Sequence, residues 1–539
     1  MYQIRKIKGV VHRQWIDAVL RYLSGTDIVH LPDLRGKLEN FEGILEPYSN
    51  IDELSNRLNE LLLRTSNALT KTYEVVENPG TDIKNFSLQA LPSSKTEDIV
   101  NELDRKLHTL SEELESELGK LTNVSSEITK QILLTNISRI QEQLLIIKST
   151  IQREFTLIET KSYLGKTEHT IYFEIFVPKF QVNTIIRGIK KVAESNCVLS
   201  EEDPSSSEET PRILQPIPEH IKVFEKLVLA FGYPSSGEIN PSLLMAITFP
   251  LLFGIMFADV AQGVLLAAFG IIFSWIKRRE MKKEHGDILN YILMSGEMLV
   301  YCGISSSFFG LLFGEAFGPS GLIHPLSLGK IGPFYLGGFE PMQEPMKMMR
   351  FALLIGVIHL SSGIVIRIIN HYRTHHFKKI PVDFCWLWLL FGGLFMWSFW
   401  GGVSNIPLWF AEGLPMMLVS IILPLALIIL FSSIAERSLE GIGFGLEVFT
   451  ETLSHTISYS RLMALGLVHS VMNNIFLILG GVSHGNFPLT SIPIMIIGTI
   501  LVMSLEGLLI FIHTLRLHWV EWFSKFYTGR GVPFKPLKL

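Results

Sequence analysis

The pattern of hydrophobic and polar positions divides the chain into two unlike parts. Up to about residue 240, apolar residues alternate with polar and charged ones at the spacing of strands and amphipathic helices. From Leu243 to Trp519, long apolar runs dominate. A run of about 20 apolar residues has the length of a membrane-spanning helix. The pattern therefore predicts an α-helical polytopic membrane protein with a polar N-terminal head.

Short elements at both ends of the head predict an α/β fold. Five segments have the spacing of strands (Gln3–Val11, Asp27–Leu31, His169–Val177) or of helices (Trp15–Tyr22, Val182–Ala193). We expect them to form lobes at residues 1–48 and 165–200. Acidic, Ser- and Pro-rich Glu201–Pro218 ends the head as a linker. The remaining boundaries are a linker at 219–241, a transmembrane domain at 242–525 and a tail at 526–539.

The segment between the lobes, residues 50–162, has the regularity of a coiled-coil arm. Apolar residues recur every three or four positions, at Ile99, Leu103, Leu107, Leu110, Leu114, Leu118, Leu121, Val124 and Ile128. One helix over Thr96–Thr160 would be about 95 Å long at ~1.5 Å per residue. A single helix cannot cover its own stripe. It therefore pairs with the preceding helix around Leu54, folds back on itself, or binds a partner.

Charge decides how often the apolar part crosses the membrane. Leu243–Ile276 is either one long tilted helix or two short spans that turn near Phe257–Gly263. The N-terminus lacks the apolar run of a signal peptide, so we expect a cytosolic head. Cytosolic loops carry the excess of Lys and Arg, and Lys277–Lys283 is strongly basic. The first stretch must then cross twice, which predicts eight spans with both termini cytosolic. The later spans are Ile288–Phe313, Phe351–Ile369, Phe384–Trp400, Leu408–Ile434, Leu446–Leu479 and Ile494–Leu517.

Composition excludes several classes of protein. The 539 residues carry a net charge of -4, with 48% hydrophobic and only 18% charged residues. The three cysteines are too widely spaced for a disulfide framework or a metal site. No Walker-type or GxGxxG motif occurs, so the chain has no nucleotide site of its own and we expect no cofactor. His371, His375 and His376 lie in a basic loop, which favours a solvated loop over a metal site.

Ionisable residues inside apolar runs are the candidate functional groups, because they are costly in a membrane. Arg461 lies near mid-membrane, too far from either end to reach water. It is either a structural ion pair with a neighbouring helix or a group that moves ions or binds an anion. Ser454 and Glu447 fall within about 20° and 40° of it around the helix, and His469 about 80° away. This polar stripe suggests a water-lined path.

The last span and the first turn supply further candidates. Glu506, His513 and Arg516 form a second set, in which Arg516 lies near the cytosolic end and could simply extend to the surface. Asp259 lies at the expected turn, where a solvated or capping carboxylate is at least as good an interpretation as a functional one.

Three segments resemble the membrane subunit of V-type and archaeal A-type rotary ATPases, called subunit a or subunit I. Ser454–Ser470 (SHTISYSRLMALGLVHS) resembles its signature helix, and His513–Pro536 (HTLRLHWVEWFSKFYTGRGVPFKP) its last helix and tail. Glu238–Gly263 (EINPSLLMAITFPLLFGIMFADVAQG) is similar to its first membrane segment, with Asp259 at the acidic position. The matches occur in the family's order, and the resemblance covers about residues 235–539.

The resemblance implies a fold and a set of roles. It implies eight spans, two of them long tilted helices that face a rotating proteolipid ring of c or K subunits. Arg461 would be the essential arginine and Arg516 the second conserved one. The positions assigned to the two ion half-channels are Glu447, Ser454, His469, Glu506 and His513. We expect Glu506 and Glu447 to line the outer channel for H⁺ or Na⁺, and the arm to hold peripheral stalk subunits of the E and G/H type.

The chain also departs from the family pattern. Its head is short, Ser460 and Met463 stand beside the arginine where bulkier residues are usual, and Asn240 replaces a frequent Asp. The short head and sparse outer loops favour an archaeal or other prokaryotic cell-membrane protein over a vacuolar one. A stand-alone secondary transporter or channel with a cytosolic regulatory head is the alternative. We expect membrane lipid but no nucleic acid as a partner.

Overall fold

The computed structural model describes most of the chain and separates it into two units. The described residues are 4–35, 46–47, 52–73, 75, 96–121, 127–203, 210–212, 217–235, 237–280, 293, 295–400, 406–411, 413–436, 440–482, 488 and 491–538. The head unit contains Met1–Ile213 together with Val532–Leu539, and the membrane unit contains Leu214–Gly531.

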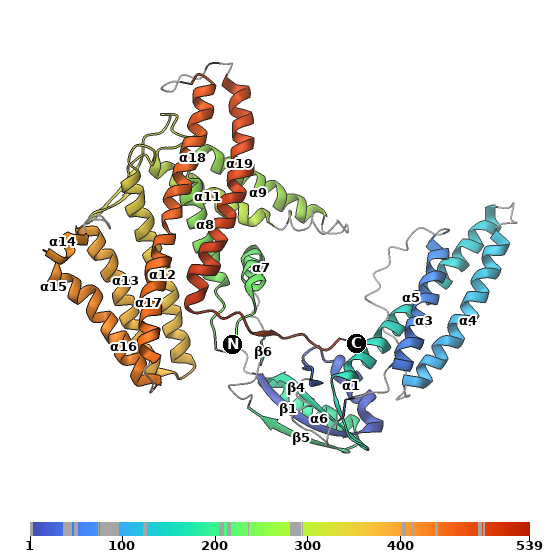
Figure 1. Cartoon of the computed structure of the whole chain (residues 1–539). Helices are drawn as coiled ribbons and strands as arrows, with labels where there is room; N and C mark the ends of the chain where they lie inside the picture. Colours follow the sequence, from blue (N-terminus) through green and yellow to red (C-terminus); the bar gives the residue numbers. More distant parts are fainter. Residues whose placement is uncertain are drawn as a thin grey trace. The chain divides into compact units, whose positions relative to one another are not determined.

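The head contains one antiparallel sheet with strand order β2-β3-β4-β1-β5. The strands are β1 (Ile4–His12), β2 (Glu46–Pro47), β3 (Gly165–Lys166), β4 (Thr170–Pro178) and β5 (Cys197–Glu202). Helices α1 (Ile16–Ser24) and α6 (Val182–Val192) contact each other, and their apolar faces share one core with β1 and β4 (Figure 1). The predicted α/β lobe is thus present.

Two details of the predicted lobe are wrong. Asp27–Leu31 is not a strand, because only His30 forms a single bridge, to Phe176. The acidic segment that starts at Glu201 is not linker at its beginning, since Glu201 and Glu202 pair with β1 as part of β5.

The arm is a three-helix bundle in which apolar faces meet. It consists of α3 (Asp52–Tyr73), α4 (Thr96–Leu121) and α5 (Glu127–Ser162), and each helix contacts the other two. The stripe therefore folds back on itself and also packs on α3, so a single helix of about 95 Å is wrong. Leu58 and Leu144 are fully buried in this core, whereas Ile128 is exposed at the start of α5. Val124 lies outside the described residues.

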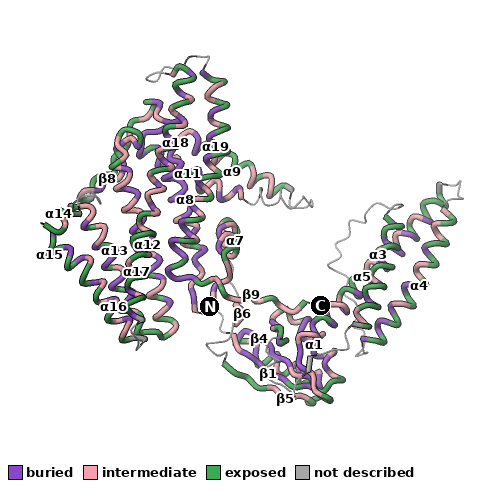
Figure 2. Tube along the Cα trace, viewed as in Figure 1, coloured by how far each residue is buried: buried purple, intermediate pink, exposed green. Residues whose placement is uncertain are grey.

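The last residues of the chain belong to the head. β6 (Pro211–Arg212) pairs in parallel with β9 (Val532–Pro533), and the two lie side by side (Figure 2). Leu537 donates its backbone N–H to the carbonyl of Val29 at 2.8 Å. His30 Nδ1 lies 3.1 Å from the backbone nitrogen and 3.0 Å from the carbonyl oxygen of Lys535. The C-terminal residues therefore form part of the folded head unit.

In its described part, the membrane unit is mainly helical, with a hairpin of β7 (Ser327–Ile331) and β8 (Phe334–Gly337). Its main helices are α7 (Lys222–Phe231), α8 (Ser242–Phe257), α9 (Val260–Glu280), α11 (Gly296–Phe313), α12 (Pro345–Arg373), α13 (Ile380–Trp400), α14 (Ile406–Ala411), α15 (Leu414–Met417), α16 (Leu423–Glu436), α17 (Glu440–Ser458), α18 (Ser460–Leu479) and α19 (Ser491–Arg516). Two π-helical segments, η8 (Leu418–Ile422) and η9 (Leu517–Trp522), and the 3-10 turn η10 (Phe523–Lys525) continue them. Figure 2 shows buried residues gathered along α8 and α11, whereas exposed residues recur along α19.

Length and composition allow 7 of the described helical segments to cross a membrane, and α8, with 16 residues, is a shorter apolar helix. The first apolar stretch is two helices, α8 and α9, that meet at Ala258–Asp259, as the charge pattern requires. Both pack against α11 through small residues. A Cβ added at Gly270 would lie 2.6 Å from the carbonyl of Gly296, so glycine permits this close approach.

The expected linker at 219–241 is partly an ordered helix. α7 packs against α8, and its Phe224 and Val228 are fully buried in the core of the membrane unit. The segment was expected to be a linker because it is short, and its periodic apolar residues do not show on which other element they pack.

Candidate functional site

Two long segments carry most of the ionisable residues that the sequence places in the membrane. α17 and α18 lie within one apolar segment of 39 residues, Gly441–Leu479, which is interrupted at Tyr459. α19, η9 and η10 form a second segment, Ser491–Lys525, of 35 residues. α18 and α19 pack against each other (Figure 1). The two long helices expected from the sequence are therefore present.

Tyr459 fixes the junction between α17 and α18. Its side chain is fully buried, and its hydroxyl lies 2.6 Å from His359 Nδ1 on α12. Gly356 on the same helix makes room for the ring, since a Cβ there would lie 2.5 Å from it. Because Arg461 follows two residues later, this contact sets the position from which its side chain extends.

Arg461 has a carboxylate partner within the chain. One terminal nitrogen donates to Glu521 Oε1 at 3.2 Å, and the other donates to Ser458 Oγ at 3.3 Å. The Glu521 side chain is 2% exposed, but that of Arg461 is 22% exposed. A guanidinium has five N–H donors, so three have no partner among the described residues. Arg461 thus forms the ion pair that a structural role requires. It also keeps N–H donors with which it could bind a second carboxylate.

Glu506 on α19 and His469, which follows Arg461 on α18, form a buried pair. His469 Nδ1 lies 2.8 Å from Glu506 Oε2, and Asn473 Nδ2 donates to His469 Nε2 at 3.0 Å. Since Nε2 accepts, Nδ1 carries the ring proton and donates it to the carboxylate. The second oxygen of Glu506, Oε1, is buried with no partner among the described residues. It is positioned to exchange a proton or to bind a water molecule.

The polar chain continues to the first turn of the membrane unit. Gln262 Nε2 donates to Asn473 Oδ1 at 2.7 Å, and the Gln262 backbone N–H donates to Asp259 Oδ1 at 2.9 Å. Asp259 is fully buried and its other oxygen accepts the N–H of Gly318 at 2.6 Å. It therefore caps α9, and a solvated carboxylate at this turn is wrong. Connected buried polar groups are typical of a hydrated path through a membrane protein.

The remaining predicted residues are more open. Glu447, Ser454 and Arg516 are exposed, and His513 is half-buried with no partner for Nδ1 in the described part of the chain. Glu447 precedes Arg461 by 14 residues and His469 follows it by 8, which is about 21 Å and 12 Å along a helix. Along this segment, Glu447 and the His469–Glu506 pair therefore lie on opposite sides of Arg461. That Glu447 and Glu506 line one outer channel stays a prediction, which this separation does not favour.

Sequence reasoning missed several members of the site. Glu521 was missed because the last span was ended at Leu517, whereas the chain continues through the π-helical η9. Such π segments are uncommon and often occur at functional positions. Glu315, two residues after the end of α11, was also missed; it is buried and accepts a hydrogen bond from Ser470 Oγ on α18. A carboxylate directly after an apolar run was the available signal.

A second network of charges connects α17 to η10 and, nearby, α13 to α12. Asp383 on α13 is fully buried and lies 3.1 Å from Arg367 Nε and 2.7 Å from His371 Nδ1. Lys525 Nζ lies 2.9 Å from Glu451 Oε1 and 4.5 Å from the centre of the Trp386 ring. His371, read from the sequence as part of a solvated basic loop, is thus a partner of a buried aspartate. Among the described residues, no group of three His, Cys, Asp or Glu could hold a metal ion.

Comparison with known proteins identifies the class of chain to which this site belongs. A family model described as V-type ATPase 116kDa subunit family matches residues 53–325 and 437–539, which include α17, α18 and α19. The chain belongs to this family. Membership agrees with the resemblance seen in the sequence, and it places Arg461, Glu506 and Glu521 inside the matched region.

Several members of the V-type ATPase 116kDa subunit family are similar over most of this chain. An A-type ATP synthase subunit I from Methanocaldococcus jannaschii is 28% identical over 86% of this chain and 68% of its own length. The proteins of the same name from Pyrococcus horikoshii and Methanothermobacter thermautotrophicus are 26% and 24% identical, over 74% and 83% of this chain. The match spans only 58% and 62% of those two relatives. All three relatives are archaeal, and with the apolar helices they indicate a multi-pass protein of the cell membrane.

Proposed function

We propose that this chain is the membrane stator subunit of an A-type rotary ATP synthase or ATPase, and that it guides protons or sodium ions past a rotating proteolipid ring. One observation carries the proposal. Arg461 lies between two separate groups of polar residues, Glu447 with Ser454 before it and His469 with Glu506 after it. Two half-channels that end at one fixed cation require this arrangement.

The fixed cation solves an electrostatic problem. A ring carboxylate that has released its ion is charged, and a charge in hydrocarbon costs several kcal/mol. The three free N–H donors of Arg461 can pair with that carboxylate as it passes. Arginine stays protonated in proteins, so it cannot itself pass a proton across. It therefore neutralises the ring group and also blocks a direct leak down a potential of ~2.3 kcal/mol per charge per 100 mV.

The buried pair would exchange the ion with the outer half-channel. His469 holds Glu506 Oε2 in place, so Oε1 is the oxygen that takes up or releases the proton. Asn473 keeps the histidine proton on Nδ1 and thereby fixes the direction of the hydrogen bond. Glu447 and Ser454, exposed on α17, would line the half-channel on the cytosolic side. His513 and Arg516 would border the ring from α19.

The head would keep the membrane unit from turning with the ring. A three-helix bundle with a continuous apolar core resists bending better than one helix, and its outer faces are charged. We infer that it anchors peripheral stalk subunits of the E and G/H type, with both termini in the cytosol.

The decisive functional test is ATP-driven ion uptake into vesicles that contain the complex with Arg461→Ala. The ring must still co-purify with the variant. An assembled complex that no longer pumps supports the proposal, whereas full pumping with intact assembly contradicts it. A complex in which no ring co-purifies with the wild-type chain would instead favour a stand-alone transporter or channel.

A further inference from the structure

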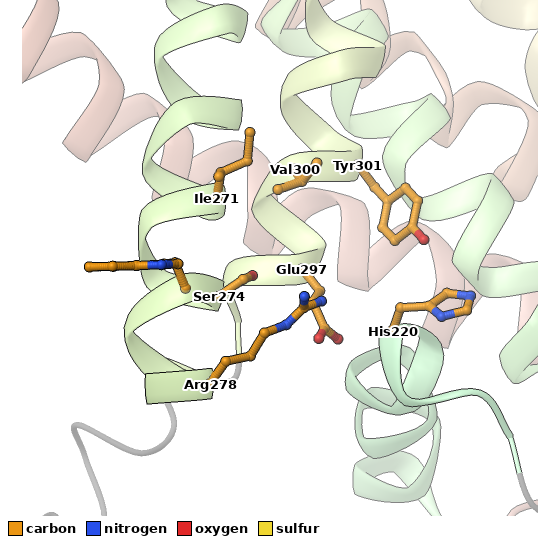
Figure 3. A pocket seen from close by; sticks show the side chains of 8 residues that line it. His220, Ile271, Ser274, Arg278, Glu297, Val300 and Tyr301 are labelled. Atoms are coloured by element: carbon orange, nitrogen blue, oxygen red, sulfur yellow. The ribbon is translucent and has the colours of Figure 1, made fainter. Parts of the chain in front are cut away.

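A hollow with mostly apolar walls and one polar end lies at the end of α9, where the helix changes from apolar to basic residues. The cavity has a volume of about 320 Å³ and is enclosed by α9, α11 and the turn at His220 (Figure 3). Ile271 and Val300 line its apolar part. Ser274, Arg278 and Glu297 line its polar part, and Figure 3 shows the three side chains near one another.

Two buried polar atoms of this hollow lack partners. Glu297 Oε2 and Ser274 Oγ have no hydrogen bond to any described residue. Within the described part of the chain, Glu297 forms one ion pair, and it is long: Oε1 lies 3.7 Å from Lys277 Nζ. A buried carboxylate oxygen without a donor is unfavourable. The site therefore favours a ligand that brings its own N–H or O–H donors.

The hollow also presents an available cation. Arg279, the next residue, lies over the Trp275 ring at 5.3 Å, and Lys277 is paired with Glu297. Arg278 lines the cavity and has no hydrogen bond or ion pair with the part of the chain that the structure describes. A guanidinium in such a position is suited to a phosphate, which it can bind through two parallel hydrogen bonds.

The surroundings identify a lipid surface as the source of the ligand. α9 is apolar enough to cross a membrane, and Ile271 and Trp275 are both 59% exposed on its surface. Tryptophan followed by basic residues is typical of the level of lipid headgroups. Acyl chains can lie along Ile271 and Val300 while a headgroup occupies the polar end.

We propose that this hollow binds one membrane phospholipid whose headgroup carries a primary amine. Arg278 binds the phosphodiester, and the ammonium donates to Glu297 Oε2 and Ser274 Oγ. A primary ammonium has three N–H donors, whereas a trimethylammonium headgroup has none. The site therefore distinguishes phosphatidylethanolamine-type lipids from phosphatidylcholine. This inference is independent of the ion path around Arg461.

The test is native mass spectrometry of the full-length chain, purified in detergent and titrated with lipids of identical acyl chains. The probes are dioleoyl phosphatidylethanolamine, phosphatidylcholine and phosphatidylglycerol. We expect the first to bind about tenfold more tightly than the second. Arg278→Ala should weaken its binding about tenfold. Glu297→Gln should remove the preference over phosphatidylcholine.

Arg279→Ala is the matched control, because it removes the same charge one residue away from the cavity lining. It should bind phosphatidylethanolamine as the wild type does. Equal losses in Arg278→Ala and Arg279→Ala would mean attraction to a basic surface only and would overturn the proposal. Equal binding of all three lipids would mean an unselective lipid layer. Preference for phosphatidylglycerol that survives Glu297→Gln would overturn the assignment of the amine.

Discussion

At Glu506, one substitution can remove the titratable group and leave the size and the hydrogen bond of the side chain unchanged. Glu506→Gln keeps the hydrogen bond from His469 Nδ1 to the side-chain carbonyl but removes the group that can be protonated at Oε1. We expect ion uptake to fall at least about tenfold in an assembled complex, since positioned proton transfer is worth that much or more. Ser504→Ala, at an exposed position of the same helix, should pump normally. Unchanged uptake in Glu506→Gln would make the pair purely structural.

His30 predicts a pH dependence of the head. Burial lowers the pKa of its imidazole below the usual value near 6.5. Above that value both the docked and the released tail have a neutral ring, and docking is fully stable. As the pH falls below 6.5, the released state takes up a proton more readily, so docking weakens. The protection factor of the Leu537 amide should therefore fall between pH 7.5 and 5.5.

The control for this pH dependence is His30→Asn. Its side-chain amide can form a hydrogen bond with the backbone N–H or the carbonyl of Lys535 in place of Nδ1, and it does not titrate. Protection of the Leu537 amide in His30→Asn should not change over this pH range. A fall of the same size in both proteins would assign the effect to another group.

The ionisable residues of the candidate site could be recognised from the sequence, because a charge inside an apolar run is visible without a structure. Arg461, Glu506 and His469 were recognised on that ground. Glu521 was not, since spacing cannot show that a helix continues as a π turn. Gln262 and Asn473 were missed because uncharged polar residues are common in spans, and only three-dimensional contact connects them.

At the scale of elements, the junction of α17 and α18 depends on Gly356. Gly356→Ala would place a methyl group 2.5 Å from the Tyr459 ring, so ring or helix must shift. Overpacking of this kind costs about 1–3 kcal/mol. We expect lower thermal stability and slower ion uptake by the assembled complex. Gly393→Ala on α13, where a Cβ meets nothing within 4 Å, should be neutral. Equal effects of both changes would contradict this role.

The arm offers a test of which part of the apolar stripe holds it together. Leu144 is fully buried in the core of the bundle, whereas Ile128, a member of the predicted stripe, is exposed. Leu144→Ala should destabilise the bundle by about 2–5 kcal/mol, and Ile128→Ala by much less. Hydrogen exchange of α3 amides in the full-length chain measures this difference. Similar exchange in the two variants would contradict the three-helix packing.

The elements themselves were largely predictable. Alternation located β1 and β4, and helical spacing located α1, α6 and α3. The fold of the arm was less predictable, because the apolar spacing continues from the residues of α4 to those of α5 and does not show that they are two helices that pack against each other. The break at Asp259 was predicted from the distribution of basic residues, which local propensity alone does not provide.

At the scale of the whole molecule, the C-terminal residues are the main surprise. Val532–Leu539 follow the last membrane helix in sequence but belong to the head unit, through β9 and the contact with His30. Pairing of residues more than 300 positions apart leaves no periodic signal in a single sequence. The chain therefore passes between the two units twice, at residues 213–214 and at residues 531–532.

The central claim is that Arg461 acts on the ion path and is more than the partner of Glu521. The most direct measurement is ATP-driven ion uptake by the complex that carries Arg461→Leu and Glu521→Leu together, with ring co-purification as the check on assembly. The double change removes both charges, so it relieves the buried unpaired carboxylate that Arg461→Leu alone would leave. We predict an assembled complex that does not pump. Restored pumping in the double variant would show that the pair is structural and would contradict the account.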